Sequence, residues 1–431
     1  MYSGWGGYPT SSCSVYRFDS KQSLQEILNT QHLLIARGNG RSYGDSSLAD
    51  NLILVRPYNY FLDFDKKEGI LHCQAGVLLS EILETVVPEG WFLTVTPGTR
   101  FVTVGGAIAS DVHGKNHHVA GTFSQSVLEF SLMKQDGQVV VCSDSENQEL
   151  YRATCGGMGL TGVILDAKIK LQPITSSMIN QLTVKTRNLA ETFEAFEQYK
   201  ESTYSVAWID CLASGRNLGR SLLMLGEHAQ EGPRVYEIRQ KLSVPFNFPS
   251  FVLNKYSTRA FNAAYYARAS KGLAQQQVDI DSFFYPLDAL DHWNRIYGKR
   301  GFLQYQFVLP LDRSYQGLEK VLNKISSAGK GSFLAVLKLF GKANDNWLSF
   351  PMEGYTLSLD FKMEMGLLDL FAELDKIVID YGGRFYLAKD ARISREKFES
   401  GYKDIEKFRE LRDAQQMNKK FNSKQSGRVE I

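Results

Sequence analysis

Short apolar stretches separated by glycine-rich breaks make up the first 170 residues. Residues 21–30 are predicted to form a helix because their apolar positions share one helical face, and the apolar run at 32–36 is predicted to be a buried strand. The same reasoning gives strands at 51–57, 126–141 and 163–174, two strands around the turn at 66–69, and helices at 80–90 and 147–154. Ser80 is the expected N-cap of the helix at 80–90, and Asp136-Gly137 is the expected turn of a hairpin. The pattern indicates a compact α+β unit.

A second unit is predicted from about residue 175, where strands and helices become longer. Strands are expected at 181–188, 203–213, 302–310, 333–341 and 355–363, and helices at 189–202, 314–329 and 366–383. This order predicts one antiparallel sheet with helices on one face. Residues 230–275 show no periodicity and are predicted to be irregular, and the charged last 45 residues are predicted to be helical.

Composition excludes several classes of protein. The 49 basic and 47 acidic residues give a net charge of +2, so no nucleic-acid partner is expected. The five cysteines are scattered without CxxC spacing, which argues against a disulfide framework or a structural zinc site and fits a reducing compartment. No signal-peptide pattern and no apolar run of about 18 residues is present. We therefore expect a cytoplasmic protein that binds no metal.

Three glycine-rich segments lie in the first unit, at residues 37–45, 97–123 and 155–162. Glycines and small residues allow a backbone to approach a ligand closely, and exposed backbone N–H groups bind pyrophosphate. The first segment, RGNGRSYGD, has neither Rossmann nor Walker A spacing, so alone it could be only a turn. A long dinucleotide lying across all three segments would explain them together.

The middle segment also carries clustered polar groups. Asp111, His113, Lys115, His117 and His118 follow the pair Gly105-Gly106. Titratable groups beside close-approach glycines are typical of a binding site. The alternative is a tight turn that packs in a core and leaves the histidines on the surface.

These motifs resemble the PCMH-type FAD-binding domain of the vanillyl-alcohol-oxidase superfamily. The resemblance rests on RGNGRSYGD, PGTRFVTVGGAIASDVHGKNHH and GGMGLTG, and it extends through WIDCLA, GFLQYQFVLP, VLKLFG, LSFPMEGYTLSLDF and FYLAKDAR. Within the superfamily, the whole set is similar to oxidases of polyprenyl-phosphate pentoses. It implies an α+β fold in which a two-subdomain FAD-binding domain (1–174) is joined to a substrate or cap domain (175–383), with an antiparallel sheet flanked by helices. Residues 384–431 are expected to return to the FAD domain.

The resemblance assigns residues to the site by motif. The implied FAD contacts are Ala36, Arg37, Gly38, Asn39, Gly40, Arg41, Ser42, Tyr43, Gly44, Asp45, Ser46, Gly98, Thr103, Val104, Gly105, Gly106, Ser110, Asp111, Val112, His113, Ile164 and Tyr386. The implied substrate contacts are Tyr43, Lys115, Trp208, Gln304, Gln306, Lys338 and Ser358, and the implied catalytic residues are Lys389 and His113.

The residue pattern agrees with this assignment. Lys338 and Lys389 lie in apolar runs, where a lysine is costly without a partner, and Gln304 and Gln306 share one face of a strand. The alternative for Lys338 is an edge-strand lysine that faces water.

Two positions depart from the family. Arg41 stands where many superfamily members tether the flavin through a histidine, so the FAD is predicted to be non-covalent. Ser358 stands where mycobacterial relatives have a cysteine.

The resemblance implies an oxidoreductase of cell-wall biosynthesis that transfers a hydride from a sugar hydroxyl, the 2′-hydroxyl of a polyprenyl-phosphate pentose, to flavin N5. An NAD-dependent reductase is the expected partner. The alternatives are an aldonolactone or alditol oxidase of the same fold, and a non-catalytic flavoprotein that serves a reductase. The apolar, proline-containing segment Ser243–Tyr256 is predicted to be a lid that touches a lipid tail or the inner face of a membrane, or else a loop folded back on the second unit.

Overall fold

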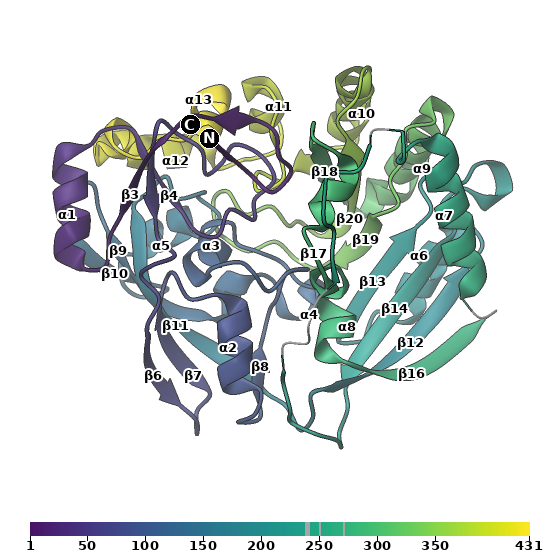
Figure 1. Cartoon of the computed structure of the whole chain (residues 1–431), viewed down its shortest axis with the longest axis horizontal. Helices are drawn as coiled ribbons and strands as arrows, with labels where there is room; N and C mark the ends of the chain where they lie inside the picture. The colour runs from purple at the N-terminus through teal and green to yellow at the C-terminus, as the bar shows by residue number, and fades with distance from the viewer. Residues whose placement is uncertain (238–241, 250, 270–271) are drawn as a thin grey trace.

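The computed structural model describes residues 1–237, 242–249, 251–269 and 272–431. The N-terminal unit contains two main sheets (Figure 1). One is the parallel sheet β3 (Ser14–Arg17), β5 (Asn51–Leu54) and β4 (Leu34–Arg37). The other is antiparallel, in the order β10 (Val139–Ser143), β9 (Val127–Met133), β11 (Val163–Pro173), β7 (Ile70–Gln74) and β6 (Phe61–Asp65), with β8 (Trp91–Leu93) also paired to β11. A short pair, β1 (Tyr2–Ser3) and β2 (Thr10–Ser11), precedes them.

The helices of this unit are short, as the glycine-broken pattern predicts. They are α1 (Lys21–Thr30), α2 (Leu79–Val86), α3 (Val104–Ala109), α4 (His117–Ala120), the 3-10 turn η1 (Phe123–Ser126) and α5 (Gln148–Thr154). The prediction that Ser80 caps α2 is wrong, because Ser80 is buried inside the helix. The N-cap is Leu78, whose backbone N–H donates to Oε2 of Glu81 at 2.8 Å. The amides of Leu79 and Ser80 in the first turn donate to the carbonyls of Val102 and Arg100, at 3.0 and 2.9 Å, so backbone carbonyls replace a hydroxyl cap.

The second unit is built on one antiparallel sheet of eight strands. Their order is β16 (Leu273–Asp279), β12 (Met178–Thr186), β14 (Ser221–His228), β13 (Tyr204–Ile209), β19 (Ala335–Phe340), β20 (Gly354–Lys362), β18 (Phe302–Pro310) and β21 (Arg384–Phe385). The α+β class is confirmed. The expectation that 230–275 is irregular is wrong in part, because α7 (Lys255–Arg268) and the start of β16 lie there.

The helix α7 begins at a cap that the sequence analysis overlooked. Asn254 Oδ1 accepts the N–H groups of Tyr256 and Ser257, at 2.8 and 3.1 Å. Among its residues only Thr258 and Asn262 are buried, so α7 has almost no apolar stripe that periodicity could reveal.

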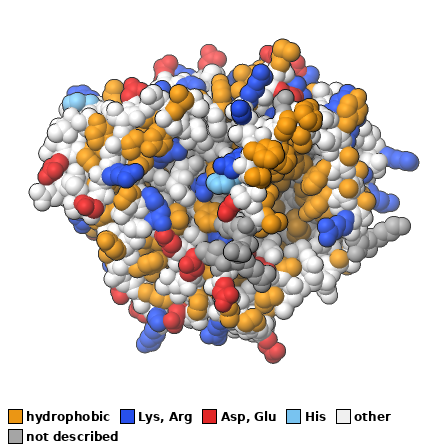
Figure 2. Space-filling view, viewed as in Figure 1, with side chains coloured by type: hydrophobic (Ala, Val, Ile, Leu, Met, Phe, Trp, Pro, Cys, Tyr) orange, Lys and Arg blue, Asp and Glu red, His pale blue; other side chains and the backbone are white. Residues whose placement is uncertain are grey.

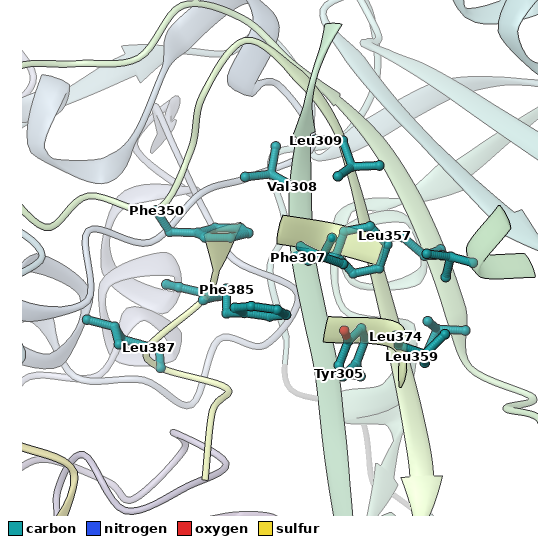
Figure 3. Packing of buried hydrophobic residues seen from close by; sticks show 14 of the residues in the cluster. Tyr305, Phe307, Val308, Leu309, Phe350, Leu357, Leu359, Leu374, Phe385 and Leu387 are labelled. Atoms are coloured by element: carbon teal, nitrogen blue, oxygen red, sulfur yellow. The ribbon is translucent and has the colours of Figure 1, made fainter. Parts of the chain in front are cut away.

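Three longer helices, α6 (Leu189–Gln198), α9 (Leu311–Ala328) and α10 (Leu367–Asp380), pack with one face of the sheet. Figure 3 shows this core, where Tyr305 and Phe307 of β18 and Leu357 of β20 meet Leu374 of α10 and Phe385 of β21. Residues alternate along each strand, so the other face of the sheet carries Gln304 and Gln306. That second face meets the N-terminal unit.

Short elements connect and close the two units. They are η2 (Gly215–Asn217), β15 (Leu242–Ser243), α8 (Ile280–Phe284), η3 (Pro286–Ala289), β17 (Leu290–Asp291), η4 (Trp293–Tyr297), α11 (Arg395–Glu399), α12 (Ile405–Ala414), η5 (Met417–Lys419) and α13 (Lys424–Val429). The C-terminal helices lie over the N-terminal unit (yellow in Figure 1). Arg428 of α13 bridges Asp45 and Asp390, at 2.7 and 2.8 Å. The domain limits 1–174, 175–383 and 384–431 stay a prediction. Among the helices of the described residues, none has both the length and the apolarity needed to cross a bilayer.

Candidate active site

A cavity of about 990 Å³ lies where the glycine segments of the N-terminal unit face the second sheet. Its N-terminal wall comes from the loop after β4, from residues 97–113 and from the start of β11. Its opposite wall, which we call the substrate wall, consists of side chains from β12, β14, β13, β19, β20 and β18. The cavity is large and only partly polar, which suits a dinucleotide together with a substrate.

The N-terminal wall forms a cradle from which side chains are missing. A Cβ added at Gly98 would meet no protein atom within 4 Å, so a side chain there would project into the cavity. At Gly38, in contrast, a Cβ would lie 2.3 Å from Oγ1 of Thr103, because the loop and the N-cap of α3 touch. Gly40 has φ of +63°, a conformation that favours glycine. This close-packed wall, with glycines at 38, 40, 98, 105 and 106, fits the FAD that the resemblance implies.

Most residues predicted to contact FAD line the cavity. They are Ala36, Gly38, Asn39, Gly40, Arg41, Ser42, Tyr43, Ser46, Gly98, Thr103, Gly105, Gly106, Ser110, Val112, His113, Ile164 and Tyr386. The guanidinium of Arg41 lies 4.2 Å from the ring centroid of Trp5, which also lines the cavity.

Five residues of the predicted FAD set do not line it and instead support the wall: Arg37, Gly44, Asp45, Val104 and Asp111. Arg37 donates to the backbone oxygens of Ser3 and Ser47, at 2.6 and 3.2 Å. Gly44 packs against Asp390, Asp45 pairs with Arg428, and Val104 is fully buried. The carboxylate of Asp111 accepts hydrogen bonds from Asn344, Asn346 and Ser349 of the second unit.

The predicted substrate residues all line the cavity: Tyr43, Lys115, Trp208, Gln304, Gln306, Lys338 and Ser358, with the predicted catalytic residues His113 and Lys389. Strand pairing places them in rows. Gln306 lies opposite Ser358, which lies opposite Val336, which lies opposite Trp208. The same alternation could have identified Val336 and Thr356, two lining residues that the sequence analysis missed.

Only one of the three clustered histidines belongs to the cavity. His113 lines it, with Nε2 3.1 Å from Nε2 of Gln306. His117 instead accepts the backbone N–H of Gly341 through Nδ1, and a ring nitrogen of His118 lies 2.8 Å from the backbone oxygen of Ser202. These two histidines connect the units, so a ligand role for them is wrong, and so is a surface location for His113, which is 7% exposed.

Burial controls the protonation of His113. Desolvation, followed by the positive charge of Lys338, holds its pKa well below the usual range, so the ring is neutral. Because Gln306 presents an amide N–H₂ to Nε2, the proton of the neutral ring belongs on Nδ1. Nδ1 is itself buried and makes no side-chain hydrogen bond among the described residues, and the adjacent backbone of Gly114 partly opposes the lowering of the pKa of the ring.

Three lysines bring positive charge into this space. Burial lowers the pKa of Lys115 to about 7 and that of Lys338 to about 8. Burial also lowers the pKa of Lys389 to about 8, although the nearby Asp360 carboxylate acts in the opposite direction. Lys338 stands on β19, between β13 and β20, which excludes an edge-strand lysine.

The three ammonium groups differ in their contacts. Lys115 donates to the backbone oxygen of Phe283. Within the described residues, the side-chain ammonium groups of Lys338 and Lys389 make no hydrogen bond or ion pair, although Lys389 Nζ lies 3.9 Å from the ring centroid of Tyr43. Unpaired, shielded ammonium groups attract an anion or a polar oxygen.

Comparison with known proteins places the chain in a family. Residues 15–143 match an FAD binding domain. The chain is 35% identical over 412 residues to decaprenylphosphoryl-beta-D-ribose oxidase of Mycolicibacterium smegmatis, covering 92% of this chain and 89% of the relative. It is also 31% identical to an uncharacterised protein of Streptomyces coelicolor, over 80% of this chain and 98% of the relative. L-gulonolactone oxidase of Mus musculus is 32% identical over 38% of this chain and 39% of its own length. The chain therefore belongs to the FAD-dependent oxidoreductases with a PCMH-type FAD-binding domain, in the family that includes decaprenylphosphoryl-beta-D-ribose oxidase.

Proposed function

We propose that the protein oxidises a secondary hydroxyl of a pentose carried on a polyprenyl phosphate, at the 2′-position. The observation that carries this proposal is that Lys338 and Lys389, two buried lysines, line the cavity without a side-chain hydrogen bond or ion pair among the described residues. A phosphate ester would supply a negative charge for Lys338, and sugar hydroxyls match the amides of Gln304 and Gln306. The long similarity to an oxidase named for a lipid-linked ribose supports the same substrate class.

Each residue of the wall has a chemical task in this reaction. FAD, when bound, supplies the acceptor for the hydride that leaves the sugar carbon. Lys389, with a pKa near 8, has a neutral fraction at physiological pH and can accept the hydroxyl proton. Neutral His113 lines the cavity and holds the Gln306 amide through Nε2, so it positions that amide for the sugar. Lys115 and Lys338 then orient the sugar or bind its phosphate.

An apolar surface beside the cavity suits the lipid. Tyr265 of α7 lies 4.8 Å from Trp208, ring centroid to centroid, and is stacked with Phe261. Phe246 and Phe251 lie on the segment that leads into α7, and they are 62% and 75% exposed. Figure 2 shows hydrophobic side chains gathered beside the hollow in this face of the molecule. This surface is proposed to hold the lipid tail or to contact a membrane.

The segment Ser243–Tyr256, predicted to be a lid, is held to η4 by hydrogen bonds between its backbone and Arg295. Phe248 N–H donates to the carbonyl of Arg295, and the Arg295 guanidinium donates to the carbonyl of Val244, both at 2.9 Å. Ser250 of this segment lies outside the described residues. We propose that the exposed side chains of Phe246 and Phe251, rather than a movement of the backbone, make the contact with lipid or membrane.

The product of this oxidation is a 2′-keto sugar, so an NAD-dependent reductase is the proposed partner for completing an epimerisation. The alternative of an aldonolactone oxidase has less support, because the L-gulonolactone oxidase of the mouse matches only 38% of this chain. A lactone also carries no phosphate for Lys338.

The test is anaerobic titration of the FAD-loaded protein with polyprenylphosphoryl ribose and with L-gulonolactone. We expect the visible flavin absorption to bleach only with the phosphorylated lipid, and mass spectrometry to find a product lacking two hydrogens. Faster bleaching by the lactone would overturn the proposal. Lys338→Met should raise KM about tenfold or more, while the matched control Lys342→Met, an exposed lysine just after β19, should leave KM unchanged.

A further inference from the structure

Asp360 is a buried acid directly behind the substrate wall. It lies on β20 opposite Gln304 of β18 and is 2% exposed. Nε2 of Gln304 donates to Oδ1 of Asp360 at 2.5 Å. Gln304 lines the cavity, whereas Asp360 does not. The carboxylate therefore reaches the cavity through the amide that it holds.

The Gln304 side chain also acts on Tyr43, the residue beside Lys389. Burial raises the pKa of the Tyr43 hydroxyl and Gln304 opposes that rise, both residues line the cavity, and the Tyr43 ring is packed edge-on to Phe302 with ring centroids 5.3 Å apart. Lys389 Nζ lies 3.9 Å from the centroid of the Tyr43 ring. A continuous set of contacts thus runs from Asp360 through Gln304 and Tyr43 to the Lys389 ammonium.

We propose that Asp360 is a positioning residue for the oxidation, which orients Gln304 and stabilises the ammonium that forms on Lys389 when the substrate loses its hydroxyl proton. The proposal rests on the proposed function, because it needs Lys389 as the proton acceptor.

Proton transfer to Lys389 creates a buried positive charge, which a nearby carboxylate stabilises. FAD, when bound, would accept the hydride of the sugar C–H group, and the neutral Lys389 amine would accept the hydroxyl proton, so that the products are the ketone and a lysine ammonium. This new cation forms close to Lys338 and His113, and Lys338 disfavours it. The negative charge of Asp360 acts in the opposite direction, because an opposite charge favours the charged form of a base.

The charged neighbours of Lys389 come from several elements. Lys338 stands on β19, Asp360 on β20, His113 after α3, and Tyr43 in the loop after β4. Burial raises the pKa of Asp360 to about 7, and the Gln304 amide and Lys389 oppose that rise. The carboxylate is therefore ionised in part near neutral pH and increasingly above it.

The experiment deletes the charge and keeps the shape. Asp360→Asn retains an oxygen for the Gln304 amide. In the FAD-loaded protein, competitive labelling of lysines with acetic anhydride, read by peptide mass spectrometry across pH, gives the pKa of Lys389 without turnover. We expect this pKa to fall by about one unit in D360N. In stopped-flow measurements with polyprenylphosphoryl ribose, flavin reduction should slow about 10- to 100-fold, with KM changed less than about threefold.

Two further variants separate positioning from a merely structural role. Asp360→Glu keeps the charge, so it should retain the wild-type pKa of Lys389 and recover part of the rate. Asp210→Asn, at another buried aspartate that pairs with Arg220 at 2.7 Å, should leave both values unchanged. Asp360→Ser deletes the charge in a smaller side chain should D360N fail to retain FAD.

The outcomes are distinct. An unchanged Lys389 pKa in folded D360N, or a loss of rate that D360E does not relieve at all, would overturn the role of Asp360. If wild-type protein fails to oxidise the lipid-linked pentose, the proposed function fails, whereas the labelling measurement still decides whether Asp360 controls Lys389.

Discussion

Replacing Asp111 should loosen the junction between the two units. The side chain is fully buried, and its Oδ2 accepts hydrogen bonds from Asn344, Asn346 and Ser349 at 2.8, 3.0 and 2.7 Å. Its Oδ1 accepts the backbone N–H of Ser124 at 3.1 Å. Asp111→Ala leaves all four donors without this acceptor.

The expected cost follows from those contacts. Hydrogen bonds to a charged group contribute roughly 1.5–3 kcal/mol each, but they share one carboxylate whose own desolvation disappears with it. Each buried neutral donor left without an acceptor costs about 1–3 kcal/mol, and because the donors share one carboxylate we expect about 3–5 kcal/mol in total rather than the full sum. For a chain of 431 residues, an unfolding entropy of roughly 0.9 kcal/mol/K converts it into a decrease in Tm of about 3–6 °C.

The assay is a thermal melt with and without added FAD. FAD affinity should fall as well, because Ser110 and Val112, on either side of Asp111, line the cavity. Asp312→Ala, at an aspartate whose side chain is 79% exposed, is the control and should change Tm by less than about 1 °C. A melt of Asp111→Ala within 1 °C of wild type would refute the reasoning, because the buried contacts would then contribute nothing.

Four further predictions test the site. Acid precipitation should leave the yellow colour in the supernatant, since Arg41 replaces the tethering histidine, and colour in the pellet would contradict a non-covalent FAD. Lys389→Ala should retain FAD and melt within a few degrees of wild type while substrate no longer reduces the flavin; full activity would remove Lys389 from the mechanism. The pKa values of Lys115, Lys338 and Lys389 are lowered from 10.5 to about 7, 8 and 8, so between these values and pH 10.5 the unfolded chain holds more protons than the native protein. Tm of the FAD-loaded protein should therefore rise with pH from about pH 7, and it should rise less steeply in Lys338→Met. A steeper rise in Lys338→Met than in wild type would contradict this sign. Replacing Phe246 and Phe251 with serine should weaken liposome binding and raise KM for a lipid-linked sugar but not for a short-chain analogue. As the control, Phe61→Ser, at a 40% exposed residue on the distant β6, should change neither liposome binding nor KM. An equal loss of activity with both substrates would exclude a lipid-contacting role.

The local pattern of apolar residues was sufficient to predict the bounds of elements whose apolar residues are buried. The helix at 21–30 has the predicted bounds because Leu24 and Leu28 mark its buried side, and the strand at 302–310 has them because its apolar run is buried along most of its length. It failed for α7, whose exposed aromatic residues Tyr256 and Phe261 hide the periodicity, and no strand was predicted at 221–228, where β14 lies. In each case, tertiary neighbours rather than spacing determine which residues are buried.

In the site, too, local spacing predicts some features and distant contacts decide the others. Strand alternation predicted that Gln304 and Gln306 share a face, and it contained the further signal that Thr356, Ser358 and Asp360 share one too. Nothing local distinguishes Asp111 from a ligand contact, because the side chains that occupy its Oδ2 lie more than 230 positions later in the chain. The family motif assigned this segment to FAD, and the structure divides it between residues that line the cavity and residues that attach the second unit.

One segment of the N-terminal unit both lines the cavity and attaches the second unit. The segment that contains Gly105, Asp111 and His117 supplies the glycine wall, the inter-unit carboxylate and the ring that accepts Gly341 N–H within 13 residues. His113 lies between these contacts, and its ring reaches Gln306 on the other unit. The position of the substrate wall relative to the FAD wall therefore depends on buried polar contacts made by one loop. A change at Asp111 or His117 should accordingly alter FAD affinity and substrate KM together, although neither side chain lines the cavity.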